Sequence, residues 1–161
     1  MASKKIFMVP TDGIVDSYIH RTDLSAEVRQ ETEAVVKKYA IASNAKRLQK
    51  AMEFGVPIAA GSDYYYVGPG KTRGQLAKWV LFAYANEGMP TIDVIRAATI
   101  NAAQLLGWDD RVGSIQPNKL ADIIAVEGDP LTDIHSLEQV QFVMKGGKII
   151  LDKKNQQSRP D

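Results

Sequence analysis

The sequence of 161 residues contains no cysteine, no long apolar run and no surplus of charge. Without cysteine the chain forms no disulfide bond and no thiolate metal site, which fits a reducing compartment. No apolar stretch approaches the roughly 18 residues that a membrane-spanning helix requires. Lysine and arginine number 20 against 19 acidic residues, so the charge indicates neither nucleic acid nor an anionic membrane as a partner. We therefore expect a cytoplasmic globular protein that binds no nucleic acid and no membrane.

What the chain does contain, in its first half, is two apolar runs separated by a long polar and helix-forming stretch. Residues 5–10 and 56–60 predict two buried strands. Between them, residues 11–24 have the composition of a loop and residues 25–54 that of a helix, which a break near residues 40–44 would divide in two. The helical stretch has an apolar face, made of Val28, Val35, Val36, Ala45, Leu48 and Met52.

The second half first keeps a helical period and then changes to that of strands. A helix opened by Thr72 or Arg73 is predicted to end near residue 88, and two short helices capped by Thr91 and Asn101 follow it. Beyond Trp108 the apolar residues alternate with polar ones, and Lys-Gly-Gly-Lys marks a tight hairpin. The predicted strands are residues 121–126, 139–144 and 149–151.

This order of elements predicts an α/β protein. Strand, helix, strand and helix indicate parallel βα units, and the antiparallel strands that follow indicate a small separate sheet. A complete (β/α)₈ barrel needs about 200 residues or more. At most about a quarter of such a barrel therefore fits into this chain.

Asp63 is the strongest candidate for a functional residue. It follows a predicted buried strand and precedes a loop rich in tyrosine and glycine, so it lies at the strand's C-terminal end, where the catalytic groups of barrel enzymes cluster. A carboxylate there can bind a divalent metal or accept a proton from water. An aspartate that caps the next helix or accepts hydrogen bonds from loop amides is an equally good interpretation of the position alone.

Five segments, taken in order, resemble motifs of the amidohydrolase superfamily. They are GVPIAAGSD (55–63), AATINAAQLLG (97–107), GSIQPNKLAD (113–122), GDPLTD (128–133) and VMKGG (143–147). Each match is weak alone, but the collinear set covers residues 55–151 and is specific. The resemblance is to the branch with imidazolonepropionase-like enzymes and Xaa-Pro or Xaa-Arg dipeptidases. Asn118 stands where the family usually has glycine, and asparagine is the commonest residue other than glycine at the positive φ of such a turn.

The resemblance implies a fold and an activity. Residues 1–110 would be the last two βα units of a TIM-like hydrolase barrel, residues 111–152 part of the small β-sandwich beside it, and residues 153–161 a polar tail. The activity would be hydrolysis of an amide or other C–N bond, in a dipeptide or cyclic amide, by a metal-activated hydroxide. Asp63 would bind the metal, expected to be zinc, and act as the general base.

The remaining metal ligands of the family are absent from this sequence. They are a His-x-His pair, a lysine or carboxylate and two later histidines, whereas this chain has only His20 and His135. We interpret both as surface or loop histidines, and we expect the chain alone to hold no metal stably and to be inactive. The alternative function is that of a non-catalytic fragment that self-associates or binds a partner, including the missing barrel portion.

Residues near Asp63 offer further candidates for substrate binding. Tyr64, Tyr65 and Tyr66 would line a pocket, or instead form an aromatic cluster that packs the loop onto the barrel. Arg73 would hold a substrate carboxylate, or instead begin a solvated helix. Asp12, in the loop after the first strand, is assigned to turn formation.

Overall fold

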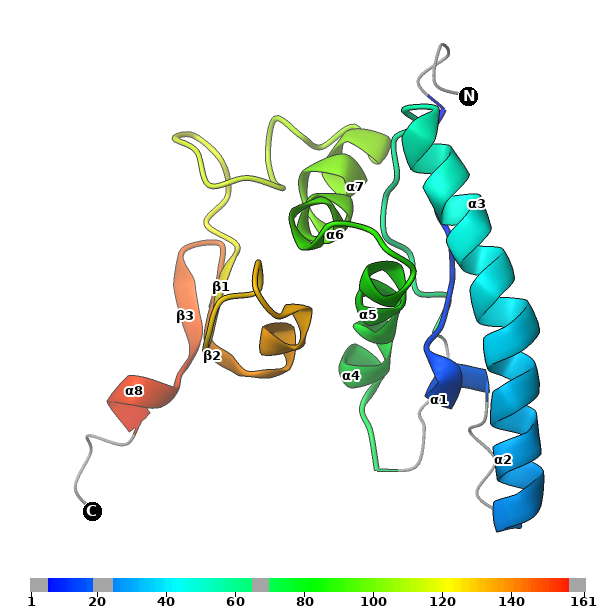
Figure 1. Ribbon diagram of the computed structural model, residues 1–161. Coiled ribbons are helices and arrows are strands. Elements are labelled where there is room, and N and C mark those ends of the chain that lie inside the picture. The colour runs from blue at the N-terminus through cyan, green and yellow to red at the C-terminus, as the bar shows by residue number, and fades with distance from the viewer. Residues whose placement is uncertain (1–5, 19–24, 65–69, 157–161) are drawn as a thin grey trace.

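The computed structural model describes residues 6–18, 25–64 and 70–156. Helices make up the larger share of the regular structure, and one small sheet lies on the side opposite the longest helix (Figure 1). The helices are α1 (Val15–Tyr18), α2 (Ala26–Val35), the π-helical segment η2 (Val36–Ile41), α3 (Ala42–Glu53), α4 (Arg73–Ala77), α5 (Trp79–Asn86), α6 (Thr91–Ala98), α7 (Ile100–Leu105), the 3-10 helix η3 (Ile134–Glu138) and α8 (Lys153–Gln156). The strands are β1 (Ile123–Val126), β2 (Val140–Lys145) and β3 (Lys148–Asp152). No described helix is both long and apolar enough to cross a bilayer.

The long helix predicted at residues 25–54 forms without a break. Ser25 caps its start, because its hydroxyl oxygen accepts a hydrogen bond from the Val28 backbone N–H at 3.3 Å. The predicted division near residues 40–44 is wrong: α2 widens into η2 and continues as α3. The predicted loop before this helix contains the short helix α1.

Within the long helix, only the α3 part contributes buried residues, whereas η2 contacts α1 without burying a side chain. Leu48 and Ala51 of α3 are buried. Val28 and Val35, which we predicted to lie on a buried face, are exposed, and α2 has no buried residue. Figure 1 shows α2 extending beyond the helices in the middle of the molecule. The apolar period of the long helix is therefore used for core packing only in α3.

The two apolar runs lie side by side in parallel, as predicted, but they pair through a single bridge between Met8 and Ile58. The Met8 N–H donates to the Pro57 carbonyl at 2.9 Å, and the Ala59 N–H donates to the Met8 carbonyl at 3.0 Å. Ile58 and Ala59 are buried, whereas Val9 in the other run is exposed. Parallel strands are normally paired on both edges. With only two hydrogen bonds between them, the two segments form an isolated bridge and not regular strands.

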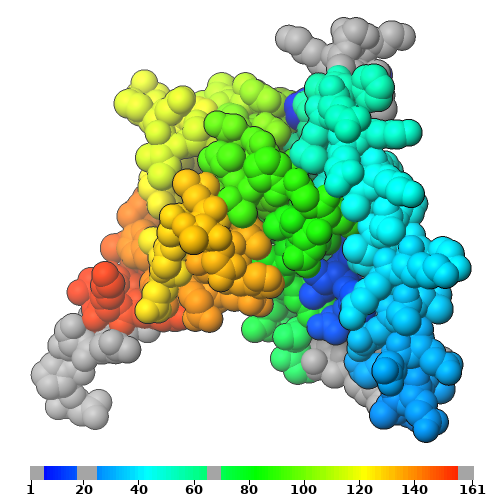
Figure 2. Space-filling view, viewed as in Figure 1, coloured from blue at the N-terminus to red at the C-terminus, as the bar shows by residue number. Residues whose placement is uncertain are grey.

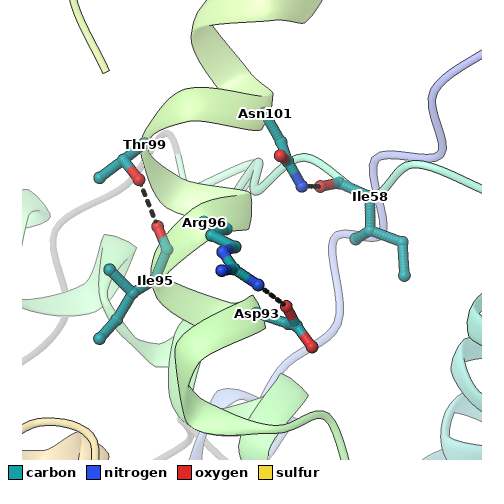
Figure 3. A network of polar contacts seen from close by, with 6 residues as sticks. All are labelled: Ile58, Asp93, Ile95, Arg96, Thr99 and Asn101. Carbon is teal, nitrogen blue, oxygen red and sulfur yellow. Dashed lines mark hydrogen bonds and ion pairs between the residues drawn. The ribbon is translucent and has the colours of Figure 1, made fainter. Parts of the chain in front are cut away.

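Helices α6 and α7 cover the other edge of residues 56–60. The Asn101 side-chain amide donates to the Ile58 carbonyl at 2.8 Å, as Figure 3 shows. The Ala60 N–H donates to the Ala97 carbonyl at 2.8 Å. The predicted helix-capping role of Asn101 is wrong, because α7 already begins at Ile100 and the amide is used on the neighbouring segment. Two backbone groups at the edge of residues 56–60 that does not face the other segment thus have hydrogen-bond partners.

The helices of the middle layer begin and end largely where the sequence predicts. Thr72 caps α4 in a capping box with Gln75, and a turn at Lys78 separates α4 from α5. The predicted cap at Thr91 is wrong: Pro90 precedes α6, and the Thr91 hydroxyl donates instead to the Leu131 carbonyl at 2.7 Å.

The core lies around α5, between α3 on one side and η3 on the other. In the space-filling view, α5 and α6 lie between α3 and the sheet region (Figure 2). Phe82 and Tyr84 are fully buried, while Trp79 is half-buried against the same cluster. The buried cluster consists of Leu48, Ala51, Ile58, Val80, Phe82, Tyr84, Met89, Val94, Ala97 and Ile134.

The three predicted strands form one antiparallel sheet in the order β1-β2-β3. Gly146 and Gly147 form the predicted hairpin turn with φ of 55° and 80°. Asp122 closes the turn, because its carboxylate accepts hydrogen bonds from the Lys145 side chain and from the Gly146 N–H at 2.6 Å. Asn118 has the positive φ that we predicted, 69°.

Candidate functional site

Asp63 ends the extended segment 56–60 in an unusual backbone conformation. Its φ is 52°, in the left-handed region that residues with a side chain seldom adopt. The side chain is exposed, and within residues 6–18, 25–64 and 70–156 its carboxylate makes no hydrogen bond or ion pair. A strained residue with an unpaired charged group at the end of a strand is a feature typical of functional sites.

The helix-cap interpretation of Asp63 does not apply. The next helix, α4, begins at Arg73, and its cap is Thr72. The Thr72 hydroxyl oxygen accepts the Gln75 N–H at 3.3 Å, while Gln75 Oε1 accepts the Thr72 N–H at 2.8 Å. Of the two structural roles that competed with a chemical one, helix capping is therefore excluded, and hydrogen bonds from the amides of residues 65–69 lie outside the described residues.

Tyr64 makes the aromatic contact that one of its two interpretations expected, and its role in lining a substrate pocket stays a prediction. Its ring contacts the Trp79 ring edge-on, with centroids 6.1 Å apart and an interplanar angle of 87°. Its backbone N–H donates to the Ser62 hydroxyl at 3.4 Å. The ring thereby packs the start of the loop onto α5, and it is only half-buried. Tyr65 and Tyr66 lie outside the described residues.

Arg73 is the exposed first residue of α4. In the described ranges its guanidinium forms no ion pair or hydrogen bond, so its side chain remains available for a substrate carboxylate. No contact joins it to Asp63, and its role in substrate binding stays a prediction.

The described residues do not form a complete metal site. Among them, no group of three or more histidine, aspartate or glutamate side chains is placed to hold a metal ion, whereas zinc sites use three or four protein ligands. The His135 ring instead stacks on Phe82, with centroids 4.4 Å apart, and its Nδ1 lies 3.5 Å from Glu138 Oε2. His135 is thus a half-exposed packing residue, while His20 lies outside the described residues.

Asp12 is not the turn residue that the sequence suggested. It is buried, with 5% of its surface exposed, and its Oδ1 accepts a hydrogen bond from the Arg47 guanidinium of α3 in an ion pair. The pair fixes the chain just after the segment 6–10, at the same end at which Asp63 follows its own segment.

Tyr84 and Glu87 lie behind this end of the two segments. The Tyr84 hydroxyl donates to the Pro10 carbonyl at 2.5 Å. Burial, and then the charge of Asp12, raise the pKa of Tyr84 well above its usual range, so the phenol stays a donor. Glu87, only 2% exposed, lies at the end of α5. Burial and the neighbouring Asp12 raise the pKa of its carboxyl to about 8.

Glu87 was missed in the sequence. The signal was present, because the segment WVLFAYAN before it is apolar on all sides and such a helix is buried all round. A glutamate that directly follows it, ahead of Gly88, is carried into the interior by that helix. Neither the pairing partner nor the depth of burial could be inferred, since both depend on Asp12, which is 75 positions earlier.

Comparison with known proteins gives the class. The model of the amidohydrolase family matches residues 9–150. This chain therefore belongs to the amidohydrolase family, as its motifs predicted.

Several relatives cover most of this chain. Ochratoxinase from Aspergillus niger is 33% identical over 154 residues, which are 92% of this chain. An imidazolonepropionase from Caldanaerobacter subterraneus subsp. tengcongensis is 34% identical over 55% of the chain. The crystal structure of an Xaa-Pro dipeptidase with bound methionine covers 85% of it, at 33% identity and a TM-score of 0.61. The chain spans about 30%, 20% and 32% of the lengths of these three proteins.

Proposed function

We propose that this chain forms the C-terminal part of an enzyme that hydrolyses an amide or other C–N bond, with Asp63 in its active site. The observation that carries the proposal is the conformation of Asp63. Its left-handed backbone presents an exposed carboxylate, without a partner among the described residues, at the end of a segment in parallel pairing. The family membership supports the reaction class, and the similarity to ochratoxinase and to the Xaa-Pro dipeptidase supports a small amide or dipeptide as substrate.

We assign to Asp63 the role of general base. An exposed carboxylate without a protein partner can accept the proton of an attacking water molecule, and a positioned base of this kind contributes about 10²–10⁴-fold to the rate. Tyr64 and Arg73 are proposed to bind the substrate, together with Tyr65 and Tyr66. Residues 1–110 are proposed to be barrel units, which the parallel pairing of Met8 with Ile58 supports.

A metal ion is expected in such an enzyme, since the amidohydrolase family is generally metal-dependent. The described residues offer one suitable carboxylate, Asp63, and not a ligand set, so no catalytic step through a metal follows from them. Binding of zinc would require ligands from outside the described residues. Zinc and a cytoplasmic location both stay predictions.

The proposal is tested by Asp63→Asn in a complete enzyme that contains this segment. Turnover of an amide or dipeptide substrate should fall on the order of 10³-fold or more, because the base is lost and a metal ligand is weakened. Asp110→Asn, which changes an exposed aspartate in the turn after α7, is the matched control and should keep its activity. Metal-dependent hydrolysis by the 161-residue chain alone, or wild-type turnover in Asp63→Asn, would contradict the proposal.

The alternative function, self-association or partner binding without catalysis, is favoured by one observation. Large apolar side chains of the sheet are exposed, among them Ile124 of β1 and Ile149 and Ile150 of β3. A groove of about 580 Å³ between α6–α7 and β1 is lined by apolar residues that include Trp108. Exposed apolar surface of this kind is typical of protein interfaces.

A further inference from the structure

Three buried carboxyl oxygens have no donor within hydrogen-bonding distance among the described residues. They are Oδ2 of Asp12 and both oxygens of Glu87. Both residues are more than nine-tenths buried. A buried acceptor without a donor costs free energy, and three in one place require an explanation.

The two carboxyl groups are neighbours that come from different parts of the fold. Asp12 follows the segment 6–10, and Glu87 follows α5. The interaction with Asp12, through charge and hydrogen bonding, is among the causes that raise the pKa of Glu87. Two ionised carboxylates cannot bond each other, because each is only an acceptor. One added proton turns one of them into a donor and makes the contact a hydrogen bond.

The charges around Glu87 do not remove the need for this proton. Arg47 of α3 lowers the pKa of Glu87, but its guanidinium is half-exposed and is bonded to Asp12 Oδ1. Asn44, also on α3, is a neutral donor directed toward Glu87 and lowers its pKa, but burial and Asp12 outweigh this effect. Tyr84 of α5 is neutral because its pKa is raised. On α6, the next helix, the charged groups Asp93 and Arg96 form an exposed ion pair with each other at 3.0 Å, shown in Figure 3.

We propose that Glu87 is protonated in the folded protein and donates a hydrogen bond to Asp12, so that one shared proton ties the end of α5 to the chain after residues 6–10. The proton comes from solvent, and no other bond is made or broken. Arg47 holds the ionised Asp12 from the other side. The contact is a pH-sensitive link that joins α3 and α5 to the end of the segment 6–10. Asp63 lies at the same end of the neighbouring segment. The link does not depend on the proposed hydrolytic function.

The link has a defined pH dependence. The pKa of Glu87 is raised from 4.5 to about 8 on folding, so between these values the folded state binds more protons than the unfolded state. The stability contributed by this group is therefore complete below the lower value and is lost as the pH rises through the higher one. Above about pH 8 the buried pair carries two negative charges against one arginine.

The test compares denaturant unfolding of the wild-type chain and Glu87→Gln from about pH 5 to about pH 9. Glutamine is isosteric and donates permanently, so its variant mimics the protonated acid. We expect the unfolding midpoint of the wild type to fall across this range and that of Glu87→Gln to stay nearly level. Glu53→Gln, an exposed glutamate of α3, should follow the wild type. Parallel curves for the wild type and Glu87→Gln would overturn the proposal.

A second measurement uses only the wild-type chain, so it does not depend on whether a variant folds. In the wild-type chain with ¹³C-labelled glutamate side chains, one carboxyl resonance should titrate near pH 8, far from those of exposed glutamates. If every resonance titrates below about pH 5.5, Glu87 carries no proton at neutral pH and the proposal fails. Stabilisation of the wild type, but not of Glu87→Gln, by calcium ions at about pH 9 would assign the free oxygens to a cation, and would equally overturn it.

Discussion

Substitution of Tyr84 by phenylalanine tests how strongly α5 is tied to the first extended segment. The phenyl ring remains in the core, so the apolar area buried by this fully covered side chain is unchanged. What is lost is the hydroxyl that donates to the Pro10 carbonyl at 2.5 Å. A backbone hydrogen bond from Gly61 to the phenol, which lowers the pKa of Tyr84, is lost as well. One group therefore joins the ends of both extended segments.

The magnitude follows from what remains after the change. The Pro10 carbonyl stays buried without its donor, and a buried polar group left unsatisfied costs about 1–3 kcal/mol. For a chain of this size each kcal/mol lowers the melting temperature by roughly 2–4 °C. We therefore expect the melting temperature of Tyr84→Phe to fall by roughly 2–12 °C.

Thermal unfolding followed by circular dichroism measures the melting temperature and urea unfolding the free energy of unfolding, with Tyr39→Phe as the matched control. Tyr39 in η2 is exposed, and removal of its hydroxyl should change the free energy of unfolding by less than about 0.5 kcal/mol. If Tyr84→Phe changed it by no more than the control does, the hydroxyl would contribute nothing net. The assignment of Tyr84 as a link between the segments would then be wrong.

Two further predictions concern a turn and the state of association. Gly113→Ala should destabilise the fold by more than about 1 kcal/mol, because φ is +89° and the new Cβ would lie 2.8 Å from that of Ala103. The control is Gly74→Ala in α4, where nothing lies within 4 Å; it should be neutral or stabilising by about 0.5–1 kcal/mol. Equal losses of stability for the two variants in thermal melts would contradict this prediction. The isolated chain should associate through its exposed sheet, and Ile124→Lys should weaken that association in sedimentation equilibrium; a wild-type chain that stays monomeric at micromolar concentration would refute the prediction.

The fold could be predicted from the sequence wherever a local pattern determined the structure. The β2–β3 hairpin forms because Gly146 and Gly147 supply the positive φ that its turn needs. Asn118 could be placed in a left-handed conformation for the same reason. The ends of the long helix followed from Ser25 and Gly55. In these cases one or two residues carry the whole requirement.

Contacts between distant segments could not be predicted in this way. Asparagine and threonine are both common helix caps. The side chains of Asn101 and Thr91 nevertheless donate hydrogen bonds to backbone carbonyls about 40 residues away in sequence, at Ile58 and Leu131. Asp63 could be singled out from its place after an apolar run, but its left-handed φ was not visible in the sequence. The same side chain can cap a helix locally or donate a hydrogen bond to a remote segment, and only the tertiary fold selects between the two.

Because Asn101 and Ala97 cover the edge at Ile58, a further strand can be added to the parallel pair only slowly. An added strand must first break the hydrogen bonds at the Ile58 carbonyl and at the Ala60 N–H, both 2.8 Å long. Growth at this edge therefore passes through a state in which α6 and α7 have moved away. At high protein concentration its rate should level off at the rate of that opening. In the described chain no further strand pairs with the outer edges of β1 and β3. The rate of association with another chain at these edges should therefore continue to rise with concentration.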